Sequence, residues 1–292
     1  MATDDGTTAA ASHTLDVEGA ELHYDVRDGD PGTGAALFII GSPMEARWFG
    51  GLVDRFPTRT VVTYDPRGAA RSTRTDPAPE STPEQHADDL HQIIDAVALG
   101  PVDLFATSGG AINALALVAR YPEDVVTLVA HEPPVTGVLP DREAARAAVD
   151  AVRATYAADG FGPGMAQFIG LTMWEGELPD EPLPAPDPQT FGLPTEDDGS
   201  RDDVLLMQNL VTSTSYQPDI DALTAAPTRI VIGVGAESEG QLAHRAGVAI
   251  AGLLGLEPVV FPSDHVGFLD GSLGMLGDPD GFATTLHDVL GD

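Results

Sequence analysis

The sequence contains no cysteine. It also contains no lysine, since all 14 of its Lys and Arg residues are arginines. The absence of cysteine excludes disulfides, a thiolate nucleophile and thiolate metal sites. The absence of lysine excludes a Schiff-base mechanism, a lysine anchor for pyridoxal phosphate and the lysine of a phosphate-binding P-loop. Several classes of covalent, cofactor and phosphate chemistry are therefore closed to this chain.

Positive charge and long apolar runs are also scarce. The 46 acidic residues give a formal net charge of −32, so no basic patch is available to neutralise phosphates. This excludes nucleic acid and anionic membrane surfaces as partners, and it favours solubility and a salty or acidic habitat. The N-terminus lacks the basic start and apolar core of a signal peptide, and nowhere do about eighteen apolar residues follow one another. We therefore expect a cytoplasmic protein that has no membrane partner.

Apolar residues make up 42% of the 292 positions, which is enough for one large α/β domain or a domain with an insertion. Strand-like segments alternate with helical ones, and the later strands are continuous apolar runs. Such runs are typical of a parallel sheet with helices on both faces. We predict an α/β fold with an eight-stranded, mostly parallel sheet, whose strands are Thr14–Val17, Glu21–Val26, Ala36–Ile40, Thr60–Tyr64, Val102–Ala106, Val125–Ala130, Arg229–Val234 and Pro258–Phe261.

Two helices between these strands carry start and stop signals. Apolar residues recur at helical spacing over 83–99, opened by Thr82 with Gln85 three positions later. The segment 238–254 has the same form, with Ser238 and Gln241 as a predicted capping box. A last helix is expected to start near Asp278 and to end with the chain.

The alternation breaks between the sixth and seventh strands, where residues 135–226 contain helical pieces and a proline-rich acidic tract. We predict a helical lid inserted at 135–226, a core domain formed by 14–134 and 227–292, and a disordered N-terminal tail at 1–13. Three lid helices are expected, at Asp141–Tyr156, Phe161–Trp174 and Asp202–Ser213. Large apolar residues of the lid either line an apolar substrate cavity or hold the insertion together, and the candidates for substrate binding are Phe168, Met173, Trp174 and Met207.

Ser108 lies between the apolar run Val102–Ala106 and the apolar helical run Ala111–Tyr121. This arrangement is typical of a nucleophile elbow, in which a strained strand-to-helix turn exposes a serine hydroxyl above the sheet. Small neighbours are needed there, and Ala106 and Gly110 meet that need. The alternative interpretation is a serine that only caps the helix.

His265 is the best base for this serine among the eight histidines. It follows the last predicted strand, and strand ends at that position lie on the same edge of a parallel sheet as the elbow. A single histidine in a loop is otherwise more often an exposed surface residue without a catalytic role. Together with Ser108, its position favours catalysis.

Two glutamates compete to orient His265. Glu237 follows the seventh predicted strand and Glu132 follows the sixth, so both stand between Ser108 and His265 in chain order. A carboxylate near a helix N-terminus would explain Glu237 without catalysis, and a buried structural carboxylate would explain Glu132. We favour Glu237 as the acid and keep Glu132 as the alternative.

Acyl transfer also needs two N–H donors for the developing oxyanion. Gly109, the residue after the nucleophile, is expected to supply one. The second should come from the loop after the third strand, where Pro43 has no N–H, so Ser42 is the better donor. Met44 is the fallback donor and a further candidate for substrate contact. No metal site is predicted, because His86 and His91 are five residues apart on a helix and point to different faces.

These motifs resemble the α/β-hydrolase fold family over nearly the whole chain. The segment 40–43 resembles that family's oxyanion loop, 64–72 resembles its D-x-R-G-x-x-x-S turn, and Ser108 and His265 fall at its triad positions. The resemblance implies a helical lid after the sixth strand and an acid usually after the seventh, which supports Glu237, although some members carry a glutamate after the sixth. It also implies that Asp65 and Arg67 brace the loop beside the oxyanion hole.

The sequence departs from the family pattern at three places: Ile40 replaces a histidine, Ala106 replaces the first glycine of the elbow, and glutamate stands where the acid is usually aspartate. The last departure leaves the acid open. The resemblance implies a serine hydrolase without a cofactor, acting on a small or medium apolar ester, lactone or thioester. Two alternatives remain, a natural-product tailoring enzyme with the same triad and a ligand-binding receptor on a hydrolase scaffold.

Overall fold

The described residues form one sheet of nine strands that runs through the protein. The computed structural model describes residues 10–292 except 33 and 273. The sheet order is β1-β2-β4-β3-β6-β7-β8-β9, with β5 paired to β2. The strands are β1 (Ala11–Val17), β2 (Ala20–Arg27), β3 (Leu37–Ile40), β4 (Val61–Asp65), β5 (Thr73–Arg74), β6 (Val102–Thr107), β7 (Val125–His131), β8 (Arg229–Gly235) and β9 (Val259–Phe261).

The sheet is antiparallel only at β2, which pairs in that sense with β1, β4 and β5, while the pairs from β4 through β9 are parallel. The predicted fold class is confirmed, but the predicted count of eight strands is wrong by one. The missed strand, β5, has two residues and forms by backbone pairing with Ala20 and Glu21, so no apolar pattern marks it.

The predicted N-terminal tail is also too long, because β1 begins at Ala11. Residues 1–9 lie outside the described part.

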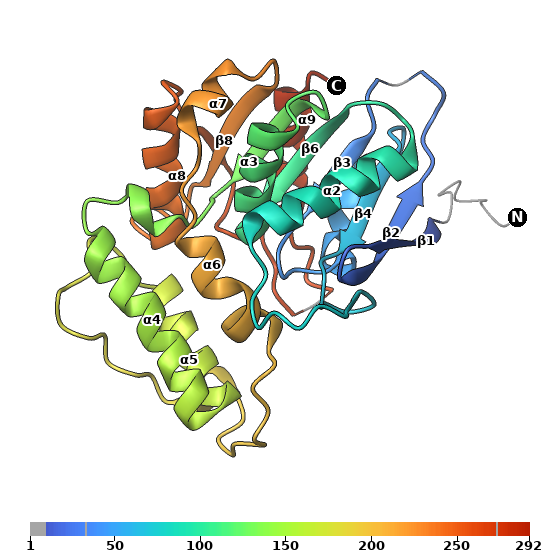
Figure 1. Ribbon diagram of the computed structural model, residues 1–292. Coiled ribbons are helices and arrows are strands. Elements are labelled where there is room, and N and C mark those ends of the chain that lie inside the picture. Colours follow the sequence, from blue (N-terminus) through green and yellow to red (C-terminus); the bar gives the residue numbers. More distant parts are fainter. Residues whose placement is uncertain (1–9, 33, 273) are drawn as a thin grey trace, which may run out of the picture.

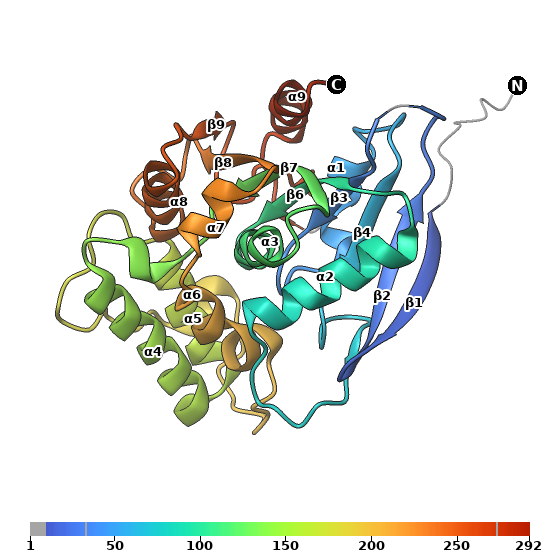
Figure 2. The same cartoon turned by 45° about the horizontal axis from the view of Figure 1, so that its top comes forward.

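Helices cover both faces of the sheet (Figure 2). On one face lie α2 (Pro83–Val97), α3 (Gly109–Arg120) and α8 (Leu242–Leu253), and on the other lie α1 (Gly50–Val53) and α9 (Pro279–Leu290). Successive side chains of a strand point to opposite faces of the sheet and pack in different apolar clusters. Phe38 and Ile40 of β3 belong to the cluster on the face of α2 and α3, while Leu37 and Ile39 belong to the cluster on the face of α1 and α9. The Thr82 hydroxyl accepts the Gln85 N–H at 3.3 Å, which confirms the predicted cap of α2.

Most helices of the insertion between β7 and β8 lie beside the sheet, whereas its last helix packs against α3 (Figure 1). The insertion contains α4 (Arg142–Asp159), α5 (Phe161–Thr172), α6 (Leu210–Thr214) and α7 (Ile220–Ala225), with short turns at Thr136–Val138, Pro188–Phe191 and Val204–Asn209. Its side chains form an apolar cluster that Leu242 and Ala246 of α8 also join. Val135 and Leu223, near the ends of the predicted lid, pack instead in the main core.

One predicted lid helix, Asp202–Ser213, is not a regular α-helix. Its first turn, Val204–Asn209, is a π-turn, and α6 follows it. The Asn209 side chain explains the difference, because its amide donates to the carbonyl of Val204 at 2.8 Å while its oxygen bonds the ring of buried His86 at 2.9 Å. This polar contact joins the insertion to α2.

Among the described residues, no helix combines the length and the apolar character that a membrane crossing requires.

Candidate active site

The carboxyl ends of β6, β7, β8 and β9 lie side by side and bring the predicted site residues to one edge of the sheet. Main-chain hydrogen bonds join consecutive strand ends. The Ser108 N–H donates to the carbonyl of His131 at 3.0 Å, and the Glu132 N–H donates to that of Gly233 at 2.9 Å. The loop after β9 is joined in the same way, because the Glu237 N–H donates to the carbonyl of Ser263 at 2.9 Å.

Ser108 has the backbone of a strained elbow, with φ 56° and ψ −130°. A side chain rarely adopts a positive φ, and such strain collects at functional sites. The turn is tight on both sides: a Cβ added at Gly109 would lie 2.5 Å from the carbonyl oxygen of Ser42, and one at Gly110 would lie 2.7 Å from the Cα of Gly41. Ser108 does not cap α3 through its side chain. Its hydroxyl makes no hydrogen bond within the described chain, and the residue is partly exposed.

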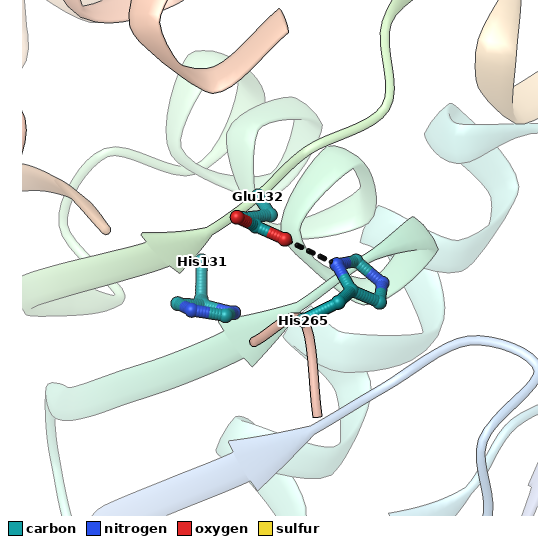
Figure 3. A group of neighbouring side chains, drawn as sticks. All are labelled: His131, Glu132 and His265. Carbon is teal, nitrogen blue, oxygen red and sulfur yellow. Dashed lines mark hydrogen bonds and ion pairs between the residues drawn. The ribbon is translucent and has the colours of Figure 1, made fainter. Parts of the chain in front are cut away.

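His265 bonds to Glu132. Its Nδ1 lies 2.6 Å from Oε2 of the carboxylate, and Figure 3 shows the two side chains pointing toward one another. Glu132 is fully buried, whereas the His265 side chain is 30% exposed. The other ring nitrogen of His265 has no hydrogen-bond partner in the described part of the chain.

The charge of Glu132 determines which nitrogen of His265 carries the proton. Burial raises the pKa of Glu132, but the hydrogen bond and charge of His265, with a smaller contribution from Ser238, lower it to about 2. The carboxylate is therefore ionised and can only accept, so the Nδ1–H of His265 donates to it. With Nδ1 donating, Nε2 is the ring nitrogen that can carry the lone pair a general base needs.

The structure does not bring Glu237 to His265, contrary to the preference for this residue in the sequence. Glu237 is exposed, and its contact with the His265 loop is made by the main chain. Glu132 reaches His265 because its own φ is 48°, which turns the chain at the end of β7. The predicted capping box is also wrong: α8 begins at Leu242 without a side-chain cap, and the Ser238 hydroxyl donates to Oε1 of Glu132.

His131 lies behind this pair and was not singled out in the sequence. It is fully buried between Phe261 and Phe282, and burial lowers its pKa to about 4, so its ring is neutral. Across the described residues, His131, Glu132 and His265 form the one group of three or more potential metal ligands whose ligand atoms all lie within 4.8 Å of one another, a spacing that suits a metal ion. Two of the three already bond to each other, so an ion would have to displace the Glu132–His265 hydrogen bond.

The loop after β3 lies against the elbow, as the contacts of Gly109 and Gly110 show. Within the described chain, the N–H groups of Ser42 and Gly109 donate to no protein acceptor, so both are free to bind a substrate oxygen. Asp65 braces this loop as expected, because its Oδ1 accepts the Ala46 N–H at 2.9 Å. Arg67 instead forms a buried bidentate ion pair with Asp89 of α2, at 2.6 and 2.7 Å.

The predicted substrate-binding residues have mixed environments. Met44 is half-buried against the apolar cluster that lies under α1 and α9. Phe168, Trp174 and Met207 pack on the insertion's apolar cluster, which agrees with the structural alternative, and Met173 is 62% exposed. A small cavity of about 80 Å³ lies between α4, α5 and residues 178–183, and none of the four lid candidates lines it.

Comparisons with known proteins give a consistent picture. A family model described as alpha/beta hydrolase fold matches residues 37–233. The "Uncharacterized hydrolase YraK" of Bacillus subtilis is 28% identical over 260 residues, which is 87% of this chain and 89% of that protein. The enol-lactonase of Burkholderia xenovorans superposes with a TM-score of 0.64 at 16% identity, covering 96% of this chain and 100% of that one. A thermophilic esterase from Thermogutta terrifontis superposes with a TM-score of 0.63 at 18% identity, covering 97% of this chain and 98% of that one.

Proposed function

The chain belongs to the α/β hydrolase fold family, and on this premise we propose that it is a serine hydrolase that cleaves a small or medium-sized apolar carboxylic ester, lactone or thioester. The observation that carries the proposal is the 2.6 Å hydrogen bond between buried, ionised Glu132 and His265. It lies at the strand ends next to the Ser108 elbow. A histidine held in this way is a general base with its lone pair directed away from the acid.

In the proposed mechanism, the oxygen of Ser108 attacks the substrate carbonyl while Nε2 of His265 takes its proton. The N–H groups of Ser42 and Gly109 bind the oxyanion of the tetrahedral intermediate, and Glu132 stabilises the imidazolium. His265 then gives the proton to the leaving oxygen or sulfur as its bond to carbon breaks, which leaves an acyl-enzyme on Ser108. Water then attacks the acyl carbon while His265 takes its proton. The bond between the acyl carbon and the Ser108 oxygen breaks, His265 returns the proton to that oxygen, and the acid is released.

One contact of this mechanism is not formed in the structure, since no hydrogen bond joins the Ser108 hydroxyl to His265 among the described residues. Catalytic hydrogen bonds are often long before substrate binds. The mechanism therefore requires these two groups to meet in the substrate complex. The net charge of −32 disfavours anionic substrates, which supports a substrate without negative charge.

The test is covalent labelling by a fluorophosphonate, followed by steady-state rates on p-nitrophenyl esters. Ser108→Ala should abolish labelling and lower kcat by at least about 10³-fold with unchanged thermal stability, because no other group replaces the nucleophile. Ser81→Ala is the control, since Ser81 lies in the segment before α2 and has no part in the proposed mechanism. Unchanged turnover in Ser108→Ala would disprove the mechanism. Rapid labelling of the unaltered protein without repeated turnover would instead favour a receptor.

A second experiment assigns the acid. Glu132→Gln should lower kcat by about 10⁴-fold, because an amide cannot fix the tautomer of His265 or stabilise its charged form. Glu237→Gln should leave kcat within about two-fold, since its side chain is exposed and its contact with the His265 loop uses the backbone. The reverse order of effects would restore Glu237 as the acid.

A further inference from the structure

The Glu132 carboxylate is held on both of its oxygens. Oε2 accepts the His265 hydrogen bond, while Oε1 accepts the Gly235 N–H at 2.9 Å and the Ser238 hydroxyl. Ser238 is 0% exposed. Its oxygen also lies 3.2 Å from the carbonyl of Gly235, but a hydroxyl has one proton, and the ionised carboxylate is the stronger acceptor.

The two donors on Oε1 differ in kind. The Gly235 N–H belongs to the end of β8 and is fixed by the sheet, whereas the Ser238 hydroxyl is a side-chain group in the turn before α8. Together they prevent the carboxylate from rotating about its last bond, so Oε2 stays directed at His265. A buried carboxylate with fewer donors would be less firmly oriented.

The turn 235–238 also fixes the other partner. The Ala236 N–H donates to the carbonyl of Phe261 at 2.9 Å, and the Glu237 N–H donates to that of Ser263. One turn therefore holds the acid through the Ser238 side chain and the His265 loop through its backbone. The fit is close, because a Cβ at Gly235 would lie 2.8 Å from the Ser238 oxygen and 2.9 Å from the backbone of Asp264.

We propose that Ser238 is a positioning residue of the site, which orients the Glu132 carboxylate toward His265 by donating its hydroxyl hydrogen bond to Oε1. The proposal rests on the proposed function, because it assigns Ser238 a part in the same hydrolytic site. Ser238 touches neither substrate nor nucleophile and acts only through Glu132.

The first test is spectroscopic and does not depend on turnover. The Nδ1 proton of His265, bonded to a buried carboxylate, should give a far-downfield proton resonance that is assigned by its loss in His265→Ala. In Ser238→Ala this resonance should move upfield and exchange faster with water, while Ser81→Ala should leave it unchanged. Ser238→Cys separates packing from hydrogen bonding, since it keeps a side chain of similar size with only a weak donor, and it should resemble Ser238→Ala.

The second test is a kinetic double-mutant cycle. Ser238→Ala should lower kcat about ten-fold with KM unchanged, a loss of the size expected for a supporting hydrogen bond to a catalytic group. In the Glu132→Gln background the same substitution should change kcat less than about two-fold, because the group that it orients no longer acts.

An unchanged resonance in Ser238→Ala would overturn the positioning role, and so would an equal loss of kcat in both backgrounds, which would mean that Ser238 acts through the fold. If the unaltered protein hydrolyses no ester, lactone or thioester, the proposed function fails. The resonance still decides in that case whether Ser238 orients the Glu132–His265 pair.

Discussion

At the end of β7, two adjacent buried residues differ in charge: one is neutral and the other is ionised. His131 is neutral because burial lowers its pKa to about 4, whereas Glu132 is ionised because its hydrogen bonds and the charge of His265 outweigh the effect of burial on its pKa. The difference is one of partners. Glu132 accepts three hydrogen bonds, while Nε2 of His131 has no partner within the described chain. A neutral ring at this position leaves Glu132 without a competing cation beside His265.

The buried histidines make stability depend on pH. His86, like His131, has a pKa lowered to about 4 by burial. An unfolded histidine titrates near 6.5, so between about pH 4 and 6.5 the unfolded state binds more protons than the folded state. The free energy of unfolding should therefore fall as the pH drops through this window, by up to about 1.4 kcal/mol per pH unit for each histidine.

Urea unfolding at pH 6.5, 5.5 and 4.5 measures this slope. His86→Gln should reduce the slope while its amide keeps a hydrogen bond to Asn209, and its stability should come closest to that of the parent protein at the lowest pH. Equal slopes in the two proteins would contradict a neutral, buried His86.

Among the elements, the contact between α3 and the loop after β3 sets the geometry of the elbow. Gly110, near the start of α3, approaches the backbone of Gly41 so closely that a Cβ has no room, and the neighbouring atoms are main-chain atoms that cannot rotate away. This approach packs the start of α3 against the loop that carries Ser42. The close packing of helix and loop, and with it the proposed oxyanion hole, therefore depends on this glycine.

Gly110→Ala should destabilise the protein by about 3 kcal/mol, because the added carbon forces the loop and α3 apart. Gly252→Ala in α8 is the matched control: no atom lies within 4 Å of the added carbon, and alanine is favoured in helices by up to about 1 kcal/mol. Thermal unfolding of the two variants should move in opposite directions. Equal stabilities for Gly110→Ala and the parent protein would show that the contact is loose.

The elements also show where sequence patterns fail. Periodicity placed α2, α4, α5 and the buried strands close to their observed bounds, because their apolar residues face a core. It failed at Ser238, whose spacing from Gln241 imitates a helix cap, and at Asn209, whose side chain interrupts a regular helix. Both side chains bond to residues more than a hundred positions away in the sequence, which no local pattern contains.

For the whole molecule, the excess of acidic residues is the dominant electrostatic feature. Most of the arginines already form ion pairs, for example Arg59 with Asp103 and Arg245 with Asp141, and the remaining carboxylates repel one another. Salt screens this repulsion, since the Debye length falls from about 10 Å at 0.1 M to about 3 Å at 1 M.

The melting temperature should therefore rise by several degrees between low and molar sodium chloride. Scanning calorimetry across that range at pH 7 measures the shift, and potassium chloride should give the same curve, because screening depends on ionic strength. A melting temperature that is constant or falls with salt would mean that surface ion pairs outweigh the repulsion.

The sequence alone determined the fold class, the elbow serine and the histidine after the last strand, because each depends on a local pattern or on the order of strands along the chain. Only the tertiary structure decided which carboxylate meets His265. Glu132 and Glu237 follow adjacent strands, so their positions in the sequence are equivalent. The positive φ of Glu132 and the bonds from Gly235 and Ser238 turn one carboxylate inward and leave the other in solvent.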